Sequence, residues 1–429
     1  MRRWRSARHV ATAALTAGVT IAASVVAASA PAAAAPPPDA WTSIGGDAAN
    51  SSTNLGERTV TTRTAARLRT AWTRKDFLGP VAPVVVKGIA YTVRQVGGAD
   101  GKSEVWAMDV RNGRRLWRLT LPGPARTYLG GTAAAGDVLV VPYEGWHEAG
   151  GLTAVDLRTR RVLWSHSHPR SSHEGTATTD TSGGVVVLDS GRAYLTTDSV
   201  LQAAYQIRTG RLLWQRSPRS GYYGGIAAAS GRLYATYTSA DHDDSLVVSD
   251  GRTGRALWSA PNLQGPPVLA GAMVVAHVGQ GVGAVAAAGC GSRTCPLRWL
   301  RTPLFDSPYA SVGAASASSV FVSGERTQDA WPGSGGLLLR LDPRTGRTQW
   351  SVRRTLRFAS VPVRGGDMVW INEWGTHVLG WPVTATSTEP LVTLPLEDEN
   401  FSGDLAVAGG SLLVQKWADA LTVFRVPGT

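Results

Sequence analysis

Lysine and cysteine are scarce in this 429-residue sequence. Lysine occurs at Lys75, Lys87, Lys102 and Lys416, and arginine supplies nearly all the remaining positive charge. The two cysteines lie far from the N-terminus, which argues against a lipid anchor attached there. Charged residues make up 17% of the chain and form no long block of one sign, which excludes a highly charged disordered protein.

Turn-forming and hydrophobic residues are plentiful. The 49 glycines and 24 prolines indicate many turns, and a hydrophobic content of 43% is enough for a sizeable core. A length of 429 residues would suggest two or three domains, but repeat folds and all-β folds can be longer. The composition therefore favours one folded body with many short elements.

The first residues have the pattern of an export signal. Four arginines at positions 2, 3, 5 and 8 precede an Ala- and Val-rich run that extends to about residue 30. Small residues and prolines follow, and we expect cleavage near Ala34. A membrane anchor is the alternative, but the run is rich in Ala, is followed by Pro and has no stop-transfer pattern. The sequence predicts a signal peptide over 1–34, a secreted, extracellular protein, and no membrane span in its mature form.

The formal net charge is +12, and removal of the four signal arginines leaves about +8. The arginines are spread through the chain, mostly at expected turns, and form no single stripe in the sequence. Nucleic-acid binding would need a concentrated basic patch on a recognisable module, so we expect no nucleic-acid partner. The basic charge favours attraction to acidic envelope polymers or anionic surfaces.

A repeat that ends in tryptophan runs through the chain. Its clearest copies read AMDVRNGRRLW from Ala107, AVDLRTRRVLW from Ala154 and AYQIRTGRLLW from Ala204. We expect Asp and Gly to form a tight turn before a strand that carries an indole to the contact between neighbouring sheets. The tryptophans predicted to dock the blades in this way are Trp72, Trp117, Trp164, Trp214, Trp258, Trp299 and Trp350.

The repeat units predict the blades of a β-propeller. Each unit of about 45 residues holds four short strands, which is the signature of a propeller blade. Seven units follow one another, and in the seventh Leu391 or Leu394 stands where the tryptophan should fall. An eighth unit from about Phe401 has three strands, and the strand 68–74 can complete it and close the ring.

We therefore predict an all-β fold, an eight-bladed propeller of four-stranded blades closed by the N-terminal strand. Seven blades are the alternative if the degenerate unit is a long loop. The expected organisation is a signal peptide at 1–34, a lead-in segment at 35–66 and the propeller at 67–429. We expect a monomer.

The AxDxxTGxxxW phrase resembles the tryptophan-docking motif of the pyrroloquinoline-quinone (PQQ) dehydrogenase-like propellers. The stretch from Trp41 to Trp72 is also similar to the lead-in of that superfamily. The resemblance covers essentially the whole mature chain and implies an eight-bladed ring. The superfamily holds alcohol and sugar dehydrogenases and non-catalytic relatives of the BamB type, so the fold does not decide the function.

The quinone enzymes of this superfamily carry an adjacent Cys-Cys pair, a Glu/Asn/Asp set that holds calcium, and an Asp base. This sequence has no adjacent cysteines, and it lacks the long insertions of the dehydrogenases. We therefore predict no catalytic residues, no metal site and no cofactor. Cys290 and Cys295, in an exported protein and within one short turn, are expected to form a structural disulfide.

Other candidate clusters have simpler explanations. His166, His168, His173 and Glu174 could gather as a metal site, but a polar outer strand running into a loop is the simpler explanation, and we prefer it. Asp241, Asp243 and Asp244 crowd a loop that could hold calcium, yet their spacing matches a solvated hairpin tip better.

Aromatic residues recur before the first hairpin of each unit and could surround one mouth of the central channel. Such a ring would suit a carbohydrate, a peptide or a flat protein surface, or each ring could simply pack on the next blade. The candidate residues, called the mouth set below, are Tyr128, His173, Glu174, Tyr222, Tyr223, Tyr309, Phe358 and Phe401.

The leading functional hypothesis is a secreted, non-enzymatic binding or scaffold propeller whose partner is a protein or a cell-envelope polymer. The alternative is a quinoprotein-type oxidoreductase, or another enzyme whose active site lies in the funnel at the mouth of the ring.

Overall fold

Short antiparallel sheets, eight in number, are the repeating element of the structure. The computed structural model describes residues 40–75, 82–96, 102–122, 131–143, 150–168, 185–197, 201–217, 221–239, 241, 243–306, 310–326, 335–374, 376–396, 403–416 and 420–429. All described elements belong to one compact unit, Ala34–Thr429. The predicted signal peptide lies outside the described residues.

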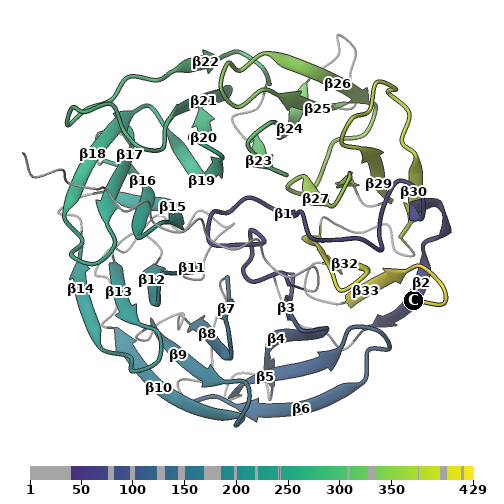
Figure 1. The fold of residues 1–429 in the computed structure, drawn as a ribbon, viewed down its shortest axis with the longest axis horizontal. Helices are drawn as coiled ribbons and strands as arrows, with labels where there is room; N and C mark the ends of the chain where they lie inside the picture. Colours follow the sequence, from purple (N-terminus) through teal and green to yellow (C-terminus); the bar gives the residue numbers. More distant parts are fainter. Residues whose placement is uncertain are drawn as a thin grey trace, which may run out of the picture. The chain divides into compact units, whose positions relative to one another are not determined.

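The sheets are the blades of an eight-bladed propeller, as predicted, and they follow one another around a ring (Figure 1). The first four blades, in chain order, are β3 (Val84–Val86), β4 (Ile89–Val96), β5 (Lys102–Asp109) and β6 (Arg115–Thr120); β7 (Ala133–Ala135), β8 (Val138–Tyr143), β9 (Gly150–Asp156) and β10 (Arg161–His168); β11 (Val185–Asp189), β12 (Arg192–Thr196), β13 (Gln202–Gln206) and β14 (Leu212–Arg216); and β15 (Tyr222–Ala229), β16 (Arg232–Thr238), β17 (Asp244–Asp250) and β18 (Ala256–Pro261).

The next three blades include the degenerate unit, which forms a complete sheet. They are β19 (Gln264–Ala270), β20 (Met273–Val278), β21 (Gly281–Ala286) and β22 (Trp299–Arg301); β23 (Ser311–Gly313), β24 (Val320–Arg326), β25 (Gly335–Leu341) and β26 (Thr348–Arg354); and β27 (Val363–Gly365), β28 (Met368–Glu373), β29 (His377–Pro382) and β30 (Val392–Pro395). The seven-blade alternative is therefore wrong.

The eighth blade is closed by the N-terminal strand, as the sequence predicted. It contains β31 (Leu405–Ala408), β32 (Ser411–Lys416) and β33 (Ala420–Arg425), and its outer strand is β2 (Arg69–Arg74), which follows the 3₁₀ helix η1 (Ala65–Arg67). Trp72 lies opposite Val423 across this antiparallel pair. A further short strand, β1 (Thr53–Asn54), joins blade seven by pairing in parallel with β27.

Each outer strand carries a β-bulge directly before its tryptophan in the clearest repeats. The register shifts at Leu116, Leu163, Leu213 and Leu257, so that each following indole is turned out of its own sheet. A bulge increases local twist and re-aims the next side chain, and the bulged Leu116, Leu163 and Leu257 are correspondingly exposed. The repeated Leu-Trp pair is thus a bulge followed by a docking side chain.

The hydrophobic core lies between adjacent blades. One cluster joins Tyr91 and Val105 of blade one to Leu139 and Val155 of blade two, and further clusters repeat this arrangement around the ring. Within the part of the chain that is described, no helix has the length and hydropathy needed to cross a bilayer.

Two ends of the ring need names. Because each blade is antiparallel, the turns between its first and second strands and between its third and fourth strands lie at one end, called here the turn end. The connections between second and third strands and between consecutive blades lie at the opposite end, called the mouth end. Of the predicted mouth set, Tyr223, at the start of β15, and Phe358, in the connection before β27, lie at the mouth end.

Candidate functional site

The middle of the ring contains residues 41–57, which are part of the chain's own lead-in segment (Figure 1). This segment hydrogen-bonds the innermost strands of blades one, two and four to eight. Trp41 and Val85 exchange both backbone hydrogen bonds. In blades two and four to seven, amides in the innermost strands or just after them donate to lead-in carbonyls, in the pairs Ala134 to Thr42, Ala228 to Ala48, Leu269 to Ala49, Ala315 to Ser51, Arg364 to Ser52 and Gly366 to Asn54.

Buried polar side chains hold the lead-in segment in this path. The Asn54 amide donates to the carbonyl of Val407 at 3.0 Å, and the Glu57 carboxylate accepts from the amide of Gly410 at 3.1 Å. Asp47 accepts from the amide and the hydroxyl of Ser51, at 3.0 and 2.8 Å. Burial raises the pKa of Asp47 above its usual value, because desolvation disfavours the carboxylate. These carboxylates stabilise the fold and are not placed as free acids in a channel.

The predicted docking tryptophans lie between neighbouring blades. The indole Nε1 of Trp72 donates to the carbonyl of Val110 at 2.8 Å, in the turn of the next blade. The same bond, at 2.8 to 3.0 Å, recurs for Trp164, Trp214, Trp299 and Trp350. Four of these indoles, those of Trp72, Trp164, Trp214 and Trp299, also lie over the turn glycine. A Cβ at Gly113, Gly210, Gly254 or Gly346 would come within 2.7 Å of a ring. The repeated glycine is therefore needed both for its positive φ and for the space that the indole occupies.

Trp117 meets a variant of this turn. The next blade has Arg160, at φ +59°, where the other turns have glycine. Trp117 packs with Tyr91 at a ring separation of 5.9 Å, and Trp117 and Leu157 of the next blade pack against the same core cluster. The docking position is kept although the glycine is replaced.

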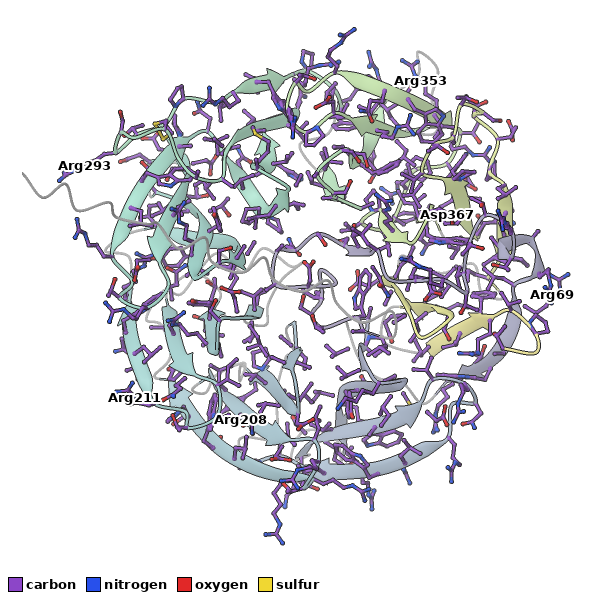
Figure 2. All side chains as sticks on the ribbon, in the orientation of Figure 1. Arg69, Arg208, Arg211, Arg293, Arg353 and Asp367 are labelled. Atoms are coloured by element: carbon purple, nitrogen blue, oxygen red, sulfur yellow. A yellow bond between two sulfur atoms is a disulfide. The ribbon has the colours of Figure 1, made fainter. Side chains whose placement is uncertain are left out.

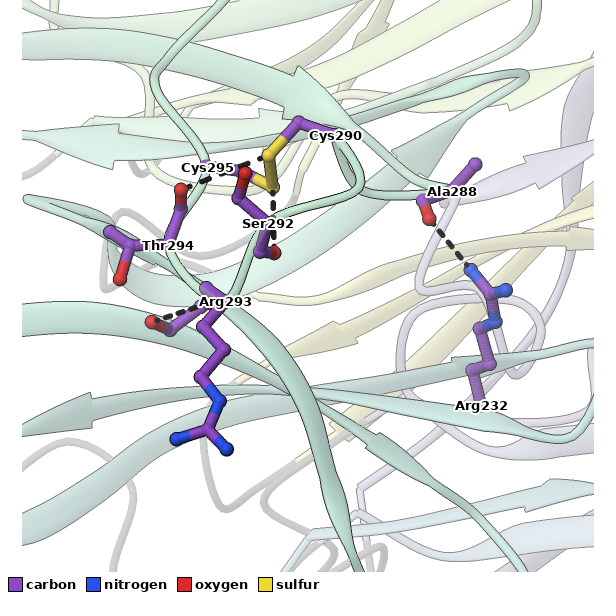
Figure 3. Close-up of a disulfide and its surroundings, with 8 residues drawn as sticks. Arg232, Ala288, Cys290, Ser292, Arg293, Thr294 and Cys295 are labelled. Carbon is purple, nitrogen blue, oxygen red and sulfur yellow. Dashed lines mark hydrogen bonds between the residues drawn. A yellow bond between two sulfur atoms is a disulfide. The ribbon is translucent and has the colours of Figure 1, made fainter. Parts of the chain in front are cut away.

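The contact between blades four and five uses the disulfide that the sequence predicted. Cys290 and Cys295 are bonded, with Cα atoms 5.6 Å apart, in the turn between β21 and β22 (Figure 3). In the preceding blade, Trp258 is buried and its Nε1 has no hydrogen-bond partner. Instead, the stapled turn pairs with the outer strand of blade four, because the Ser259 amide donates to Arg293 at 2.8 Å and the Cys295 amide donates to Ser259 at 2.7 Å. The staple therefore shapes a blade contact that replaces the usual indole hydrogen bond.

Two aromatic residues of the mouth set are described with their side chains, and both pack across blade contacts. Tyr223 is half-buried, lies 5.6 Å from the ring of Tyr237 and has the Arg216 guanidinium of the preceding blade 6.0 Å from its centroid. Phe358 packs against the core cluster of blades six and seven, close to Gly336. Of the others, the side chain of Tyr222 and all of Tyr128, His173, Glu174, Tyr309 and Phe401 lie outside the described residues. A ligand site at the mouth stays a prediction.

His166, the one member of the histidine cluster whose side chain is described, takes part in a blade contact. His166 Nε2 lies 2.7 Å from the carbonyl of Gly210, and its ring stacks on Tyr205 with centroids 5.3 Å apart. His166 thus occupies the position two residues after the docking tryptophan, where Arg74, Arg216 and Arg301 bind the equivalent glycine carbonyl in other blades. The side chain of His168 and all of His173 lie outside the described residues.

Sequence reasoning missed a set of buried polar side chains at the mouth end. Asn372 and Glu373 end the apolar strand β28, and Glu373 binds the Nε of Arg354 at 3.0 Å. Asp404 precedes β31, and burial raises its pKa although the backbone amide of Ala82 hydrogen-bonds it. His277, at the end of β20, has a pKa lowered to about 4 by burial and is therefore neutral at pH 7. The available signal was a polar residue closing an otherwise apolar run, which is weak in a single sequence.

The described residues do not fit a PQQ–calcium site. The chain's two cysteines form a hairpin staple at the turn end, not an adjacent pair beside a cofactor. No three His, Cys, Asp or Glu side chains within the described ranges are grouped so that they could share a metal ion. We therefore derive no chemistry through a quinone.

Comparison with known proteins agrees with the predicted resemblance. A family model described as outer membrane protein assembly factor BamB matches residues 2–260 and 196–294. A search of curated proteins finds no significant match.

Solved structures share the fold at low sequence identity. The quinohemoprotein alcohol dehydrogenase ADHIIG from Pseudomonas putida HK5 is 15% identical, with a TM-score of 0.64 over 92% of this chain and 81% of that one. A europium-containing methanol dehydrogenase is 12% identical, with a TM-score of 0.63 over 90% and 98% of the two chains. BamB from Moraxella catarrhalis is 15% identical, with a TM-score of 0.54 over 83% and 99%. At these identities the likeness concerns the fold alone.

Proposed function

The chain belongs to the family described as outer membrane protein assembly factor BamB, and we propose that it is a non-enzymatic binding or scaffold propeller. Its proposed partner is a protein or a polymer of the cell envelope. The proposal includes export by the N-terminal segment, because a basic start and an apolar run precede the folded unit.

The observation that carries this proposal is the path of the lead-in segment. Its backbone is hydrogen-bonded to blades one, two and four to seven, and the side chains of Asn54 and Glu57 bond to blade eight, so the chain itself occupies the inner ends of the blades. A partner therefore has the two ends of the ring and its outer wall to contact. This arrangement supports surface recognition by loops and turns that a rigid scaffold positions.

The residue chemistry supports binding over oxidation. The two cysteines and the carboxylates Asp47 and Glu57 are all used in structural contacts. Propellers of this type host both dehydrogenases and scaffolds, so the choice depends on the residues present.

Two measurements on the full mature chain test the proposal together. Calorimetry with PQQ and Ca²⁺, followed by dye-linked oxidation assays on alcohols and sugars, should give neither saturable binding nor turnover. Cosedimentation with isolated cell-envelope material should show saturable binding that the unlabelled chain displaces. Stoichiometric quinone binding with turnover would contradict the proposal, and so would envelope binding no greater than that of an unrelated propeller.

A further inference from the structure

Equivalent turns of successive blades are brought to one end of the ring. Each docking tryptophan begins its outer strand at the turn end and contacts the next blade's turn between third and fourth strands, as Trp72, Trp164, Trp214 and Trp299 do. These contacts link the turns in a chain from blade to blade. Residues that are far apart in the sequence but share a place in the repeat therefore share one end of the molecule.

Exposed arginines fill these turns. They lie in blades one to six, and the start of β2 adds more in blade eight. Figure 2 shows Arg208, Arg211 and Arg293 at the outer edge of the ring, with Arg69 at its edge on another side. The set, called the arginine arc below, comprises Arg63, Arg67, Arg69, Arg111, Arg114, Arg115, Arg158, Arg160, Arg161, Arg208, Arg211, Arg252, Arg255, Arg293, Arg298, Arg344 and Arg347.

The acidic residues of the same turns do not cancel this charge. Asp109 is paired with Arg111 at 2.9 Å, which lowers its pKa, and Asp156 and Asp250 have pKa values lowered by hydrogen bonds from their own turns. Each of these turns has one acid and two or three arginines. In blades three and five, the turns have arginines and no acid between residues 206 and 211 and between 287 and 298. Every turn of the arc thus keeps a net positive charge.

The arc is distinct from the arginines that hold the ring together. Arg74, Arg216 and Arg301 reach across to the glycine carbonyl of the next turn and are half-buried. Arg208, Arg252 and Arg344 are exposed and lie on the solvent side of the turns. Their guanidinium groups are not needed for the docking contacts, so removing them should leave the fold intact.

We propose that the turn end of the ring docks on a planar anionic lipid surface through the arginine arc. A flat partner can meet turns from several blades at once, because those turns lie at one end of the same disc-like set of blades. A linear polyanion would have to bend around the ring to do so. Guanidinium groups bind phosphate through paired hydrogen bonds, and basic side chains near an anionic bilayer each add to the affinity.

This inference goes beyond the proposed scaffold function and does not depend on it. A scaffold could hold its partner at the mouth end while the turn end rests on a membrane. Failure of the lipid proposal would leave the scaffold proposal standing, because envelope binding that purified lipid vesicles do not reproduce points to a protein or polymer partner.

Vesicle cosedimentation tests the inference. The full mature chain is mixed with phosphatidylcholine vesicles that contain either no phosphatidylglycerol or 40% phosphatidylglycerol, at low and high salt. We expect binding to the anionic vesicles alone, and loss of that binding as salt screens the charges. The variant R208Q/R252Q/R344Q should bind roughly 100-fold more weakly, since each basic side chain near the surface contributes about fivefold.

The control variant removes the same charge at the mouth end. Lys102, Arg326 and Arg353 are exposed there, and K102Q/R326Q/R353Q should bind as the unaltered chain does. Thermal unfolding checks that both variants are folded. Equal binding by the two variants, or equal binding to neutral vesicles, would overturn the proposal. Tighter binding of soluble polyphosphate than of anionic vesicles would overturn it in favour of a linear polymer.

Discussion

At the scale of single residues, the docking tryptophans show how a repeat can use one side chain for two tasks. The indole face covers the glycine of the next turn, and the indole N–H satisfies a backbone carbonyl there. The sequence predicted the position of these side chains from the spacing of the repeat. It could not predict the hydrogen-bond partner, because a carbonyl oxygen leaves no signature in the sequence.

Comparing Trp214 with Trp258 isolates the contribution of the indole hydrogen bond, because only Trp214 makes it. Trp214 Nε1 donates to Gly251 at 3.0 Å, whereas the Nε1 of Trp258 is buried without a partner. Because a net hydrogen bond contributes about 1 kcal/mol, Trp214→Phe should lower the free energy of unfolding by about 1 kcal/mol more than Trp258→Phe. Urea unfolding of the two variants measures this difference. Equal losses would show that the N–H bond contributes nothing.

His277 gives a prediction about pH. Its pKa is lowered by burial to about 4 in the folded chain, against about 6.5 in an unfolded one, so the unfolded state binds the proton more readily. Its contribution to stability is therefore present above pH 6.5 and is lost as the pH falls towards 4. At about 1.4 kcal/mol per pKa unit, the loss is on the order of 3 kcal/mol.

The variant His277→Gln should lack this part of the pH dependence. The unfolding free energy of the unaltered chain should fall more steeply with acid than that of the variant. Below pH 5 the two values should therefore converge, or the variant should become the more stable protein. Parallel curves between pH 7 and pH 4 would contradict a neutral, buried His277.

At the scale of elements, the sequence predicted the blades well and the lead-in path poorly. Trp72 in the strand 68–74 pointed to closure of the last blade, because a docking tryptophan stood at the wrong end of the chain. The lead-in segment instead binds mainly through its backbone, so its side-chain pattern gave no sign that it lies inside the ring. The β-bulges were missed for a related reason, since the repeated Leu-Trp pair looks like two core residues.

The stapled turn yields a prediction at this scale. Reduction of the Cys290–Cys295 bond, or the C290S/C295S variant, should cost about 2 kcal/mol, because the closed loop is short. The loss of stability should be local, so the amides of Ser259 and Cys295, which pair blade four with the stapled turn, should exchange faster with solvent. Hydrogen exchange with mass spectrometry measures the exchange rates of these amides. Unchanged exchange at these amides would show that the turn keeps its shape without the disulfide.

At the scale of the whole molecule, the fold turns a scattered charge into an organised one. The sequence shows arginines spread over its length with no stripe, which argued against a nucleic-acid partner. Arg208, Arg252 and Arg344 nevertheless share a place in the repeat, and the ring brings equivalent places to one end. In a repeat protein, charged residues at equivalent positions of successive units can therefore form one surface, although they are far apart in the sequence.

The candidate mouth site was predictable only in part. Tyr223 and Phe358 recur at equivalent places, and both of their rings pack between blades. Asn372, which is buried, and Asp404, which is half-buried, lie at the same end and carry no repeat signature, so one sequence could not single them out. Buried polar groups of this kind are recognised once the strands are placed.

The lead-in segment occupies the inside of the ring and bonds its blades, which leaves the two ends of the ring for binding. Hydrogen exchange of the full chain tests this placement at the amides of Ala134, Ala228, Leu269, Ala315, Arg364 and Gly366, which donate to lead-in carbonyls. We expect these amides to exchange together, in the unfolding reaction that opens the whole ring, and to lose protection together in the variant N54A/E57Q. Rapid exchange of these amides while the middle strands of the blades stay protected would contradict the account.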